Sequence, residues 1–334
     1  KQFLNRSLNS FYVTKNSAPR EVFKAKLKID KMSGLNNLFK GSGSFYDCEP
    51  NSFDVLIVDE AHRLNKKSGL FSNLGENQIK EIINSSKFSI FFIDENQRVT
   101  LKDNGSIDEI KKYARYYNAG IHKMELKSQF RCDGSDGYLA WLDNVLEIRG
   151  TANFDLDSKY DFKVFDDPNE LRKAIEKKNR INNKSRLVAG YCWNWISEGK
   201  NKSDVYDITI PEYNFGMSWN LGNSSTWAID KESVNEIGCI HTCQGLEFDY
   251  VGVIIGDDLR YENDHIVTDY TKRAKTDQSI KGINKIAKEE GIEEAKRITD
   301  SIIKNTYKTL MTRGMKGCYV YCIDKKLSNY LKNR

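Results

Sequence analysis

The chain has 334 residues, which is long enough for two domains with substantial cores. It contains 52 lysines and arginines against 47 aspartates and glutamates, and this small positive excess permits a polyanionic partner without requiring one. No signal peptide and no membrane-spanning apolar run is apparent, so we expect no membrane partner. Seven cysteines without a histidine cluster indicate buried free thiols in a reducing, cytoplasmic setting rather than a zinc site.

Strand-like and helix-like segments alternate from residue 10 to about residue 150. Such alternation is typical of βα units around a parallel sheet. The expected strands are 10–13, 53–58, 87–94 and 122–130, and the expected helices are 14–27, 77–86, 106–118 and 137–146.

The sequence turns polar and irregular near residues 151–160, which predicts a domain boundary there. We therefore expect a first domain over 1–152 and a second over 153–334. The alternation then restarts with an expected strand at 161–165, a helix at 169–179 and a strand at 186–193. The predicted fold class is α/β, with a parallel sheet in each half.

Two segments interrupt this rhythm and are expected to be insertions in the second domain. Residues 200–235 place aromatic side chains among glycine, asparagine and serine, which favours a loop or β insertion with its own packing over a base-stacking platform. Residues 260–304 are highly charged and are expected to form exposed helices. A nucleic-acid contact through Lys272, Arg273 and Lys275 is the less favoured interpretation of that segment.

Acidic side chains follow the apolar run 53–58 directly, as Asp59 and Glu60. A polar loop start would explain them, but ligands of open α/β sheets bind beside the carboxyl ends of the strands. An aspartate there can hold Mg²⁺ next to a nucleotide phosphate, and a neighbouring glutamate can activate water. The next strand also ends in an acid, Asp94, and Gln97 follows it with an amide suited to a phosphate oxygen and a water.

Further candidate side chains follow later strands and helices. Arg131 comes after an extended segment, and Arg313 lies between a helix and a strand; a guanidinium at either place can bind phosphate. The stretch 237–255 contains a turn in which Gly245 allows close backbone approach to a ligand and Glu247 can accept from a ribose hydroxyl.

Five short motifs in order resemble motifs II to VI of superfamily 1 helicases: DEAH at 59–62, D-x-x-Q at 94–97, Q-F-R at 129–131, H-T-x-Q-G-L-E-F at 241–248 and L-M-T-R at 310–313. In finer detail the chain is similar to the Schlafen group 3-like DNA/RNA helicase domain family, over residues 10 to about 323. The resemblance implies two RecA-like P-loop NTPase domains with ATP in the cleft between them and DNA or RNA as partner.

The resemblance also implies a role for each matching residue. Asp59, in the Walker B motif, would bind Mg²⁺ and Glu60 would activate the catalytic water, while Gln97 would couple the phosphate state to the nucleic-acid track. The remaining implied contacts are Arg131 and Arg313 with the γ-phosphate, Gly245 and Glu247 near the ribose and hinge, and Thr14, Asn16, His241 and Thr242 with nucleic acid.

One departure from the family pattern concerns the phosphate-binding loop. The sequence contains no G-x-x-x-x-G-K-[ST] motif, which the resemblance would place just upstream of Lys1, so the first domain is expected to be truncated at its N-terminus. Without the lysine and amides of that loop, ATP loses its main anchor. We therefore expect this chain alone to bind ATP and Mg²⁺ weakly and not to hydrolyse ATP.

Two other functions remain open at this point. The first is a non-hydrolysing nucleic-acid-binding module on a helicase scaffold, although a decayed scaffold should lose some of its costly cleft charges. The second is a metal-dependent hydrolase or nuclease that uses Asp59, Glu60 and Asp94, although no further cluster of carboxylates and histidines supports it.

Overall fold

This computed structural model describes residues 3, 6–27, 38–69, 72–126, 132, 136–156, 160–196, 205–220 and 226–334. The chain divides into two compact units, Lys1–Glu125 and Leu126–Arg334, which are described separately below. Within the described residues no helix is long and apolar enough to cross a membrane.

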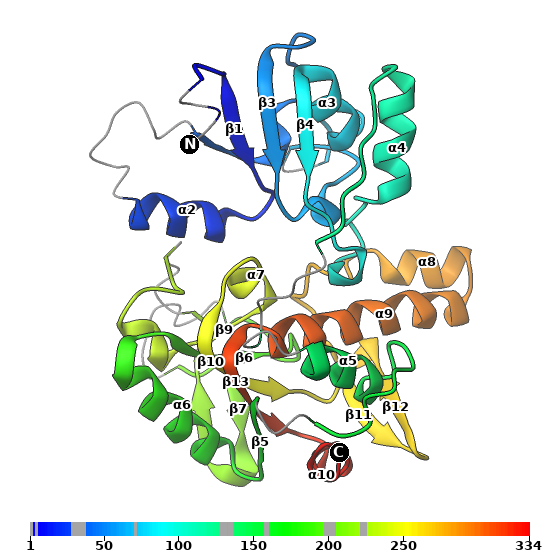
Figure 1. Cartoon of the computed structure of the whole chain (residues 1–334). Helices are drawn as coiled ribbons and strands as arrows, with labels where there is room; N and C mark the ends of the chain where they lie inside the picture. Colours follow the sequence, from blue (N-terminus) through cyan, green and yellow to red (C-terminus); the bar gives the residue numbers. More distant parts are fainter. Residues whose placement is uncertain are drawn as a thin grey trace. The chain divides into compact units, whose positions relative to one another are not determined.

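The described part of the first unit is built on a parallel sheet with the strand order β2-β1-β3-β4 (Figure 1). The expected strands at 10–13 and 53–58 are confirmed, and the third runs from residue 86 to 91. The strand bounds are Ser10–Val13 (β1), Phe39–Lys40 (β2), Phe53–Val58 (β3) and Ser86–Phe91 (β4). Strand β3 lies between two neighbours, which explains its near-continuous apolar sequence.

Three helices of the first unit begin at capping residues whose side-chain oxygens accept from backbone N–H groups of the first turn. Asn16 accepts from Ala18 N, and Asn77 accepts from Ile79 N at 2.9 Å. The helices are Ser17–Lys26 (α2), Gln78–Ser85 (α3) and Ile107–Tyr116 (α4), the last capped by Ser106. The core of the unit gathers apolar side chains from β1, β3 and α3.

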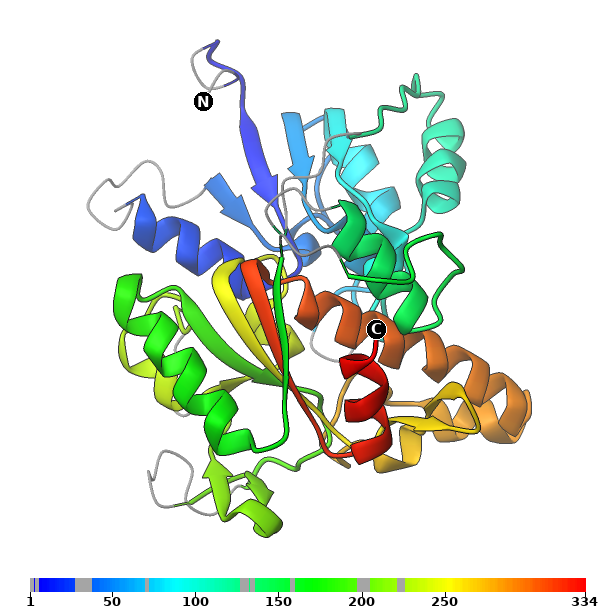
Figure 2. The same cartoon turned by 60° about the horizontal axis from the view of Figure 1, so that its bottom comes forward.

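The second unit contains a parallel sheet with the strand order β5-β13-β10-β6-β9 among the residues that the structure describes. In Figure 2, helix α6 lies on one face of this sheet and helices α9 and α10 lie on the other. The strands are Asp161–Phe165 (β5), Ser185–Ala189 (β6), Ile237–Gly238 (β9), Phe248–Ile255 (β10) and Gly314–Cys322 (β13). The helices are Asp136–Val145 (α5), Pro168–Asn182 (α6), Ile240–Cys243 (α7), Ile283–Glu289 (α8), Ile292–Met311 (α9) and Lys325–Lys332 (α10). Two parallel α/β units confirm the predicted fold class.

Helix α5 belongs to the second unit, whereas the sequence analysis placed it in the first. The Tyr138 hydroxyl donates to the Met311 carbonyl at 3.1 Å, and Trp141 Nε1 donates to the Arg334 carbonyl at 3.3 Å. These contacts reach the two C-terminal helices, so the division falls after Glu125 rather than after residue 152. The strand expected at 122–130 is also absent over 122–126, and its remainder lies outside the described residues.

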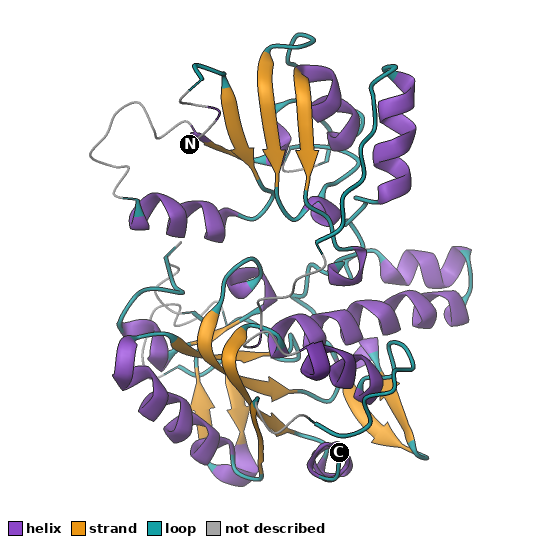
Figure 3. Cartoon of the chain, viewed as in Figure 1, coloured by secondary structure: helices purple, strands orange, loops and turns teal. Residues whose placement is uncertain are grey.

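Both expected insertions have structure of their own (Figure 3). The first contains an antiparallel hairpin of β7 (Ile208–Ile210) and β8 (Phe215–Met217). Trp219 is 1% exposed and stacks on Tyr191, which agrees with the expected packing of the aromatic side chains within this segment. The second contains the hairpin β11 (Leu259–Glu262) and β12 (His265–Thr268) and then α8 and α9. Helix α9 buries a full face, so this segment is not the set of exposed helices that its charge predicted.

Candidate active site

The carboxyl end of β3 places Asp59 beside β1. The Asp59 backbone N–H donates to the Val13 carbonyl at 2.8 Å, and its carboxylate accepts from the Tyr12 hydroxyl and from the Glu60 N–H. Burial raises the pKa of the Asp59 carboxyl above its ordinary value, although the Tyr12 hydrogen bond acts in the opposite direction. A buried carboxylate with a raised pKa is a group that a divalent metal ion would stabilise.

Glu60 adopts a left-handed backbone conformation with φ of 52°, which is uncommon for a residue other than glycine. Its side chain is buried, and its Oε2 lies 3.0 Å from His62 Nε2. The strained turn therefore directs the Glu60 carboxylate onto the His62 ring. Such strain persists where the surrounding structure fixes it, and it often accompanies functional sites.

A chain of contacts connects Glu60 to Gln97, across the ends of the neighbouring strands β3 and β4. His62 Nδ1 accepts from the Asp94 backbone N–H at 3.4 Å, and Asp94 Oδ2 accepts from Gln97 Nε2 at 2.8 Å. The Phe92 N–H donates to the Val58 carbonyl at 2.9 Å and holds the two strand ends together. The structure thus brings the predicted Glu60 and Gln97 into one network, through His62 and Asp94.

A second buried network at the same edge of the first unit escaped the sequence analysis. Lys15 Nζ donates to Asn65 Oδ1 at 2.8 Å and lies 3.1 Å from Asp103 Oδ1, while Arg63 Nε lies 3.7 Å from the same oxygen. Burial alone would raise the pKa of Asp103, but the Arg63 and Lys15 cations bring it below its ordinary value. Burial in turn lowers the pKa of Lys15, against the attraction of Asp103. These residues gave no sequence signal beyond their charge.

In the second unit, Arg313 is fully buried directly before β13. Its Nε donates to the Thr309 carbonyl at 3.0 Å, and its Nη1 contacts the Leu246 carbonyl at 3.4 Å. The Phe248 N–H donates to the Arg313 carbonyl at 2.8 Å. These bonds tie the end of α9 to the turn before β10, so the structure joins two segments that the sequence singled out separately.

The turn before β10 contains the other predicted residues of the second unit. Gly245 has φ of 82°, which explains why glycine occupies that position, and Glu247 is exposed. Thr242 Oγ1 accepts from the Cys239 N–H at 2.9 Å and caps the short helix α7, on which His241 also lies. The strand before His241, β9, is only two residues long, and His241 and Thr242 follow it on a helical turn.

The structure places the three remaining predicted residues in different environments or does not describe them. Arg131 lies outside the described residues. Thr14 is fully buried after β1, whereas Asn16 is half-buried and caps α2. All seven cysteines are described free thiols; Cys132, Cys239, Cys243, Cys318 and Cys322 are buried, whereas Cys48 and Cys192 are half-buried. No cluster of three or more metal-ligating side chains occurs among the described residues.

Comparison with known proteins decides the family. The family model described as Schlafen group 3, DNA/RNA helicase domain matches residues 2–324. The chain belongs to this family. This result confirms the resemblance that its motifs indicated.

Individual relatives are more distant. The chain is 27% identical over 302 residues to a Saccharomyces cerevisiae protein described as uncharacterized protein YPL245W; the match covers 83% of this chain, which spans 64% of the length of that relative. Two solved structures of S. cerevisiae Dbp5 align with 98% of this chain. One, bound to RNA and ADP BeF3, is 11% identical with a TM-score of 0.31 over 75% of its length. The other, a variant bound to a Gle1 variant and IP6, is 10% identical with a TM-score of 0.33 over 73% of its length, and scores this low carry no functional argument.

Proposed function

We propose that this helicase-family chain is the motor part of an ATP-dependent enzyme that acts on DNA or RNA in the cytoplasm. The observation that carries the proposal is the contact chain from Glu60 through His62 and Asp94 to Gln97. A motor must couple the state of its nucleotide to movement. This series of contacts connects the Glu60 carboxylate, a candidate to activate water, to the Gln97 amide, a candidate to sense the phosphate. A simple loop start would not need such a connection.

The first unit supplies the groups for hydrolysis in this proposal. Asp59 would hold Mg²⁺, which neutralises phosphate charge when bound, and its buried carboxylate with a raised pKa fits that role. Glu60 orients and deprotonates the attacking water, and Gln97 contacts the terminal phosphate. His62 keeps the Glu60 carboxylate in place.

The second unit supplies positive charge and a ribose contact. Arg313 would stabilise charge on the transferring phosphoryl group, which requires its guanidinium to leave the Thr309 and Leu246 carbonyls that now hold it. Arg131 has the same proposed role. Gly245 and Glu247 would contact the nucleotide sugar, and His241 and Thr242 would contact the nucleic acid, together with Thr14 and Asn16 of the first unit.

ATP binding by this chain alone is proposed to be weak, since its sequence contains no G-x-x-x-x-G-K-[ST] loop. The test compares this chain with the longest protein encoded in the same reading frame. ATP hydrolysis is measured with and without single-stranded DNA and RNA, in the natural sequence, in Glu60→Gln and in Glu293→Gln, whose side chain is 86% exposed.

We expect nucleic-acid-stimulated hydrolysis by a protein of this reading frame that contains a phosphate-binding loop, a loss of about 10²–10⁴-fold in Glu60→Gln, and no loss in Glu293→Gln. Nucleic-acid binding without turnover would instead favour the non-hydrolysing module. Strand cleavage with metal and no ATP would favour a nuclease. Tight ATP binding by this chain alone would contradict the weak-binding claim.

A further inference from the structure

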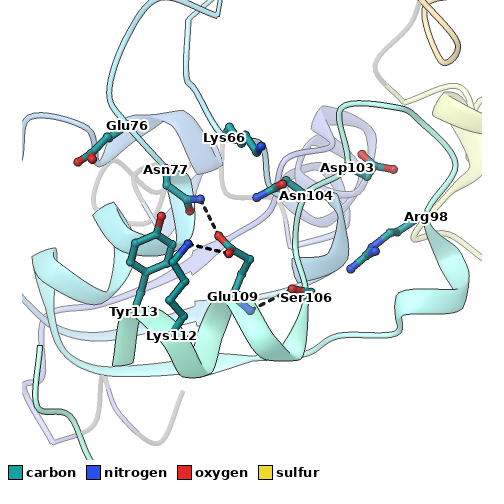
Figure 4. Close-up of a pocket in the computed structure, with 10 residues that line it drawn as sticks. All are labelled: Lys66, Glu76, Asn77, Arg98, Asp103, Asn104, Ser106, Glu109, Lys112 and Tyr113. Atoms are coloured by element: carbon teal, nitrogen blue, oxygen red, sulfur yellow. Dashed lines mark hydrogen bonds and ion pairs between the residues drawn. The ribbon is translucent and has the colours of Figure 1, made fainter. Parts of the chain in front are cut away.

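The first unit contains a cavity of about 450 Å³ whose lining residues include none of Glu60, His62, Asp94 and Gln97 (Figure 4). Its walls come from the loop after β3, the loop after β4 and the first turns of α4. A volume of this size falls in the range of small-ligand sites. The walls are mostly polar, so the chemistry of the occupant follows from the groups that are still available for bonding.

The three acidic side chains of the cavity already have partners, and the most exposed of them, Glu76, pairs with Lys80. Asp103 is bound by Lys15 and by the Val99 and Thr100 N–H groups at 3.0 and 3.1 Å. Glu109 accepts from Asn77 Nδ2 at 3.2 Å and from Lys112 Nζ at 3.0 Å. The dashed lines in Figure 4 show the two bonds to Glu109. These carboxylates are therefore neutralised by protein groups and do not call for a cationic ligand.

The available groups are hydrogen-bond donors. Asn104 is fixed by its backbone N–H, which donates to the Leu64 carbonyl at 2.8 Å, and its side-chain Nδ2 is buried without an acceptor among the described residues. Among the residues that the structure describes, no carboxylate lies within ion-pair distance of Lys66. In Figure 4 the nitrogen atoms of Lys66 and Asn104 point to the same region of the cavity. A buried amide N–H is costly unless an acceptor reaches it.

A further positive charge lies in the wall. Arg98 Nη2 donates to the Gly105 carbonyl at 2.6 Å and pairs with Glu95 at 3.2 Å, so its guanidinium is fixed in position. A ligand that fits these walls presents oxygen acceptors and negative charge.

We propose that this cavity binds a phosphate group or a similar oxyanion through Asn104 Nδ2 and Lys66 Nζ. Arg98 adds electrostatic attraction at the wall. The phosphate can belong to a nucleic-acid backbone, to a free nucleotide or to inorganic phosphate, because the recognising groups are the same for all three. The site uses none of the residues assigned to hydrolysis, so phosphate binding at this cavity can be tested independently of ATPase activity.

The test is a titration of the full chain with inorganic phosphate. Isothermal calorimetry and ³¹P line broadening measure the binding. The variants are Lys66→Gln, Asn104→Leu and Lys102→Gln. Lys102 is exposed on the same loop as Asn104 but does not line the cavity, and it is the matched control. Competition with ATP and with a single-stranded oligonucleotide then identifies the natural source of the phosphate.

We expect saturable phosphate binding that weakens at least tenfold in Lys66→Gln and Asn104→Leu and is unchanged in Lys102→Gln. Asn104→Leu should keep or raise the melting temperature without phosphate, because it removes a buried donor that lacks an acceptor. It should also lose the rise in melting temperature that phosphate gives the natural chain. No saturable binding, equal binding by all variants, or an equal loss in Lys102→Gln would overturn the proposal.

Discussion

His62 Nε2 lies 3.0 Å from Glu60 Oε2, and the opposite ring nitrogen of His62 accepts a backbone N–H from Asp94. The Asp94 contact uses the lone pair of Nδ1 as acceptor, and the Nε2 side of the ring lies against the Glu60 carboxylate. The imidazole thus contacts the ends of two neighbouring strands.

Replacing His62 with alanine is expected to lower the free energy of unfolding by about 1–3 kcal/mol, because a buried Glu60 carboxylate loses its partner. Urea unfolding measures the loss. Amide hydrogen exchange at Asp94 should become faster, since its N–H loses its acceptor. The control is His265→Ala, whose side chain is 75% exposed and which should change neither quantity. Unaltered exchange at Asp94 in His62→Ala would contradict the bridging role.

The buried carboxyl of Asp59 predicts a particular pH dependence of stability. Its pKa is raised in the folded chain, so the folded state binds the proton more tightly than the unfolded state. Its contribution to the free energy of unfolding is therefore largest below its unfolded pKa and is lost as the pH rises through the folded pKa. Relative to Asp59→Asn, the natural chain should lose stability as the pH rises above about 4, the ordinary pKa of an aspartate, until the raised folded pKa is passed.

The same experiment has an internal check in Tyr12→Phe. The Tyr12 hydrogen bond lowers the pKa of Asp59, so its removal should raise that pKa further and enlarge the loss of stability with rising pH. Urea unfolding at several pH values gives these slopes. Parallel curves for the natural chain and Asp59→Asn would show that Asp59 does not titrate in this range.

The sequence could predict the polar residues that follow β3 and β4 but not which of their side chains meet. The run 53–58 identified β3 and its acidic end, because a buried strand needs apolar residues on both faces. The contact of His62 with Asp94 depends on the register of β3 against β4, in which Val58 pairs with Phe91. A single sequence does not contain that register, so neither His62 nor the Lys15–Asp103 pair could be foreseen.

Charge in a sequence gave the least reliable structural prediction. Arg273, which was considered as an exposed nucleic-acid contact, has a fully buried side chain that bonds Asp277 Oδ2 at 2.6 Å and lies 3.2 Å from Asp258 Oδ2. Its flanking Lys272 and Lys275 are exposed. Local sequence does not distinguish the buried Arg273 from the exposed Lys272 and Lys275. The two aspartates contact Arg273 only in the folded chain, where this segment packs against the end of β10.

Arg273→Met is expected to lower the free energy of unfolding by about 3–5 kcal/mol, because it leaves Asp258 and Asp277 buried without a cation. Lys272→Gln should stay within about 0.5 kcal/mol of the natural chain. Urea unfolding compares the two. A measured loss of nucleic-acid affinity in Arg273→Met without any loss of stability would restore the surface-contact interpretation.

Gly105 lies against the backbone turn that carries the Glu60–His62 pair. A Cβ atom at Gly105 would meet the Ala61 carbonyl oxygen at 1.8 Å and His62 Cα at 2.8 Å, and Arg98 fixes the Gly105 carbonyl by two hydrogen bonds. Neither backbone can move without breaking bonds. Gly105→Ala is therefore expected to cost at least about 1–3 kcal/mol.

The matched control for Gly105→Ala is Gly120→Ala, because an added Cβ at Gly120 meets nothing within 4 Å. Urea unfolding should separate the two variants, and backbone amide NMR shifts should move at Ala61 and His62 in Gly105→Ala alone. Since Glu60 precedes this turn, the same displacement should also slow any hydrolysis that depends on its carboxylate. A Gly105→Ala chain that matches the natural one in stability and in these shifts would show that the turn is not held by this packing.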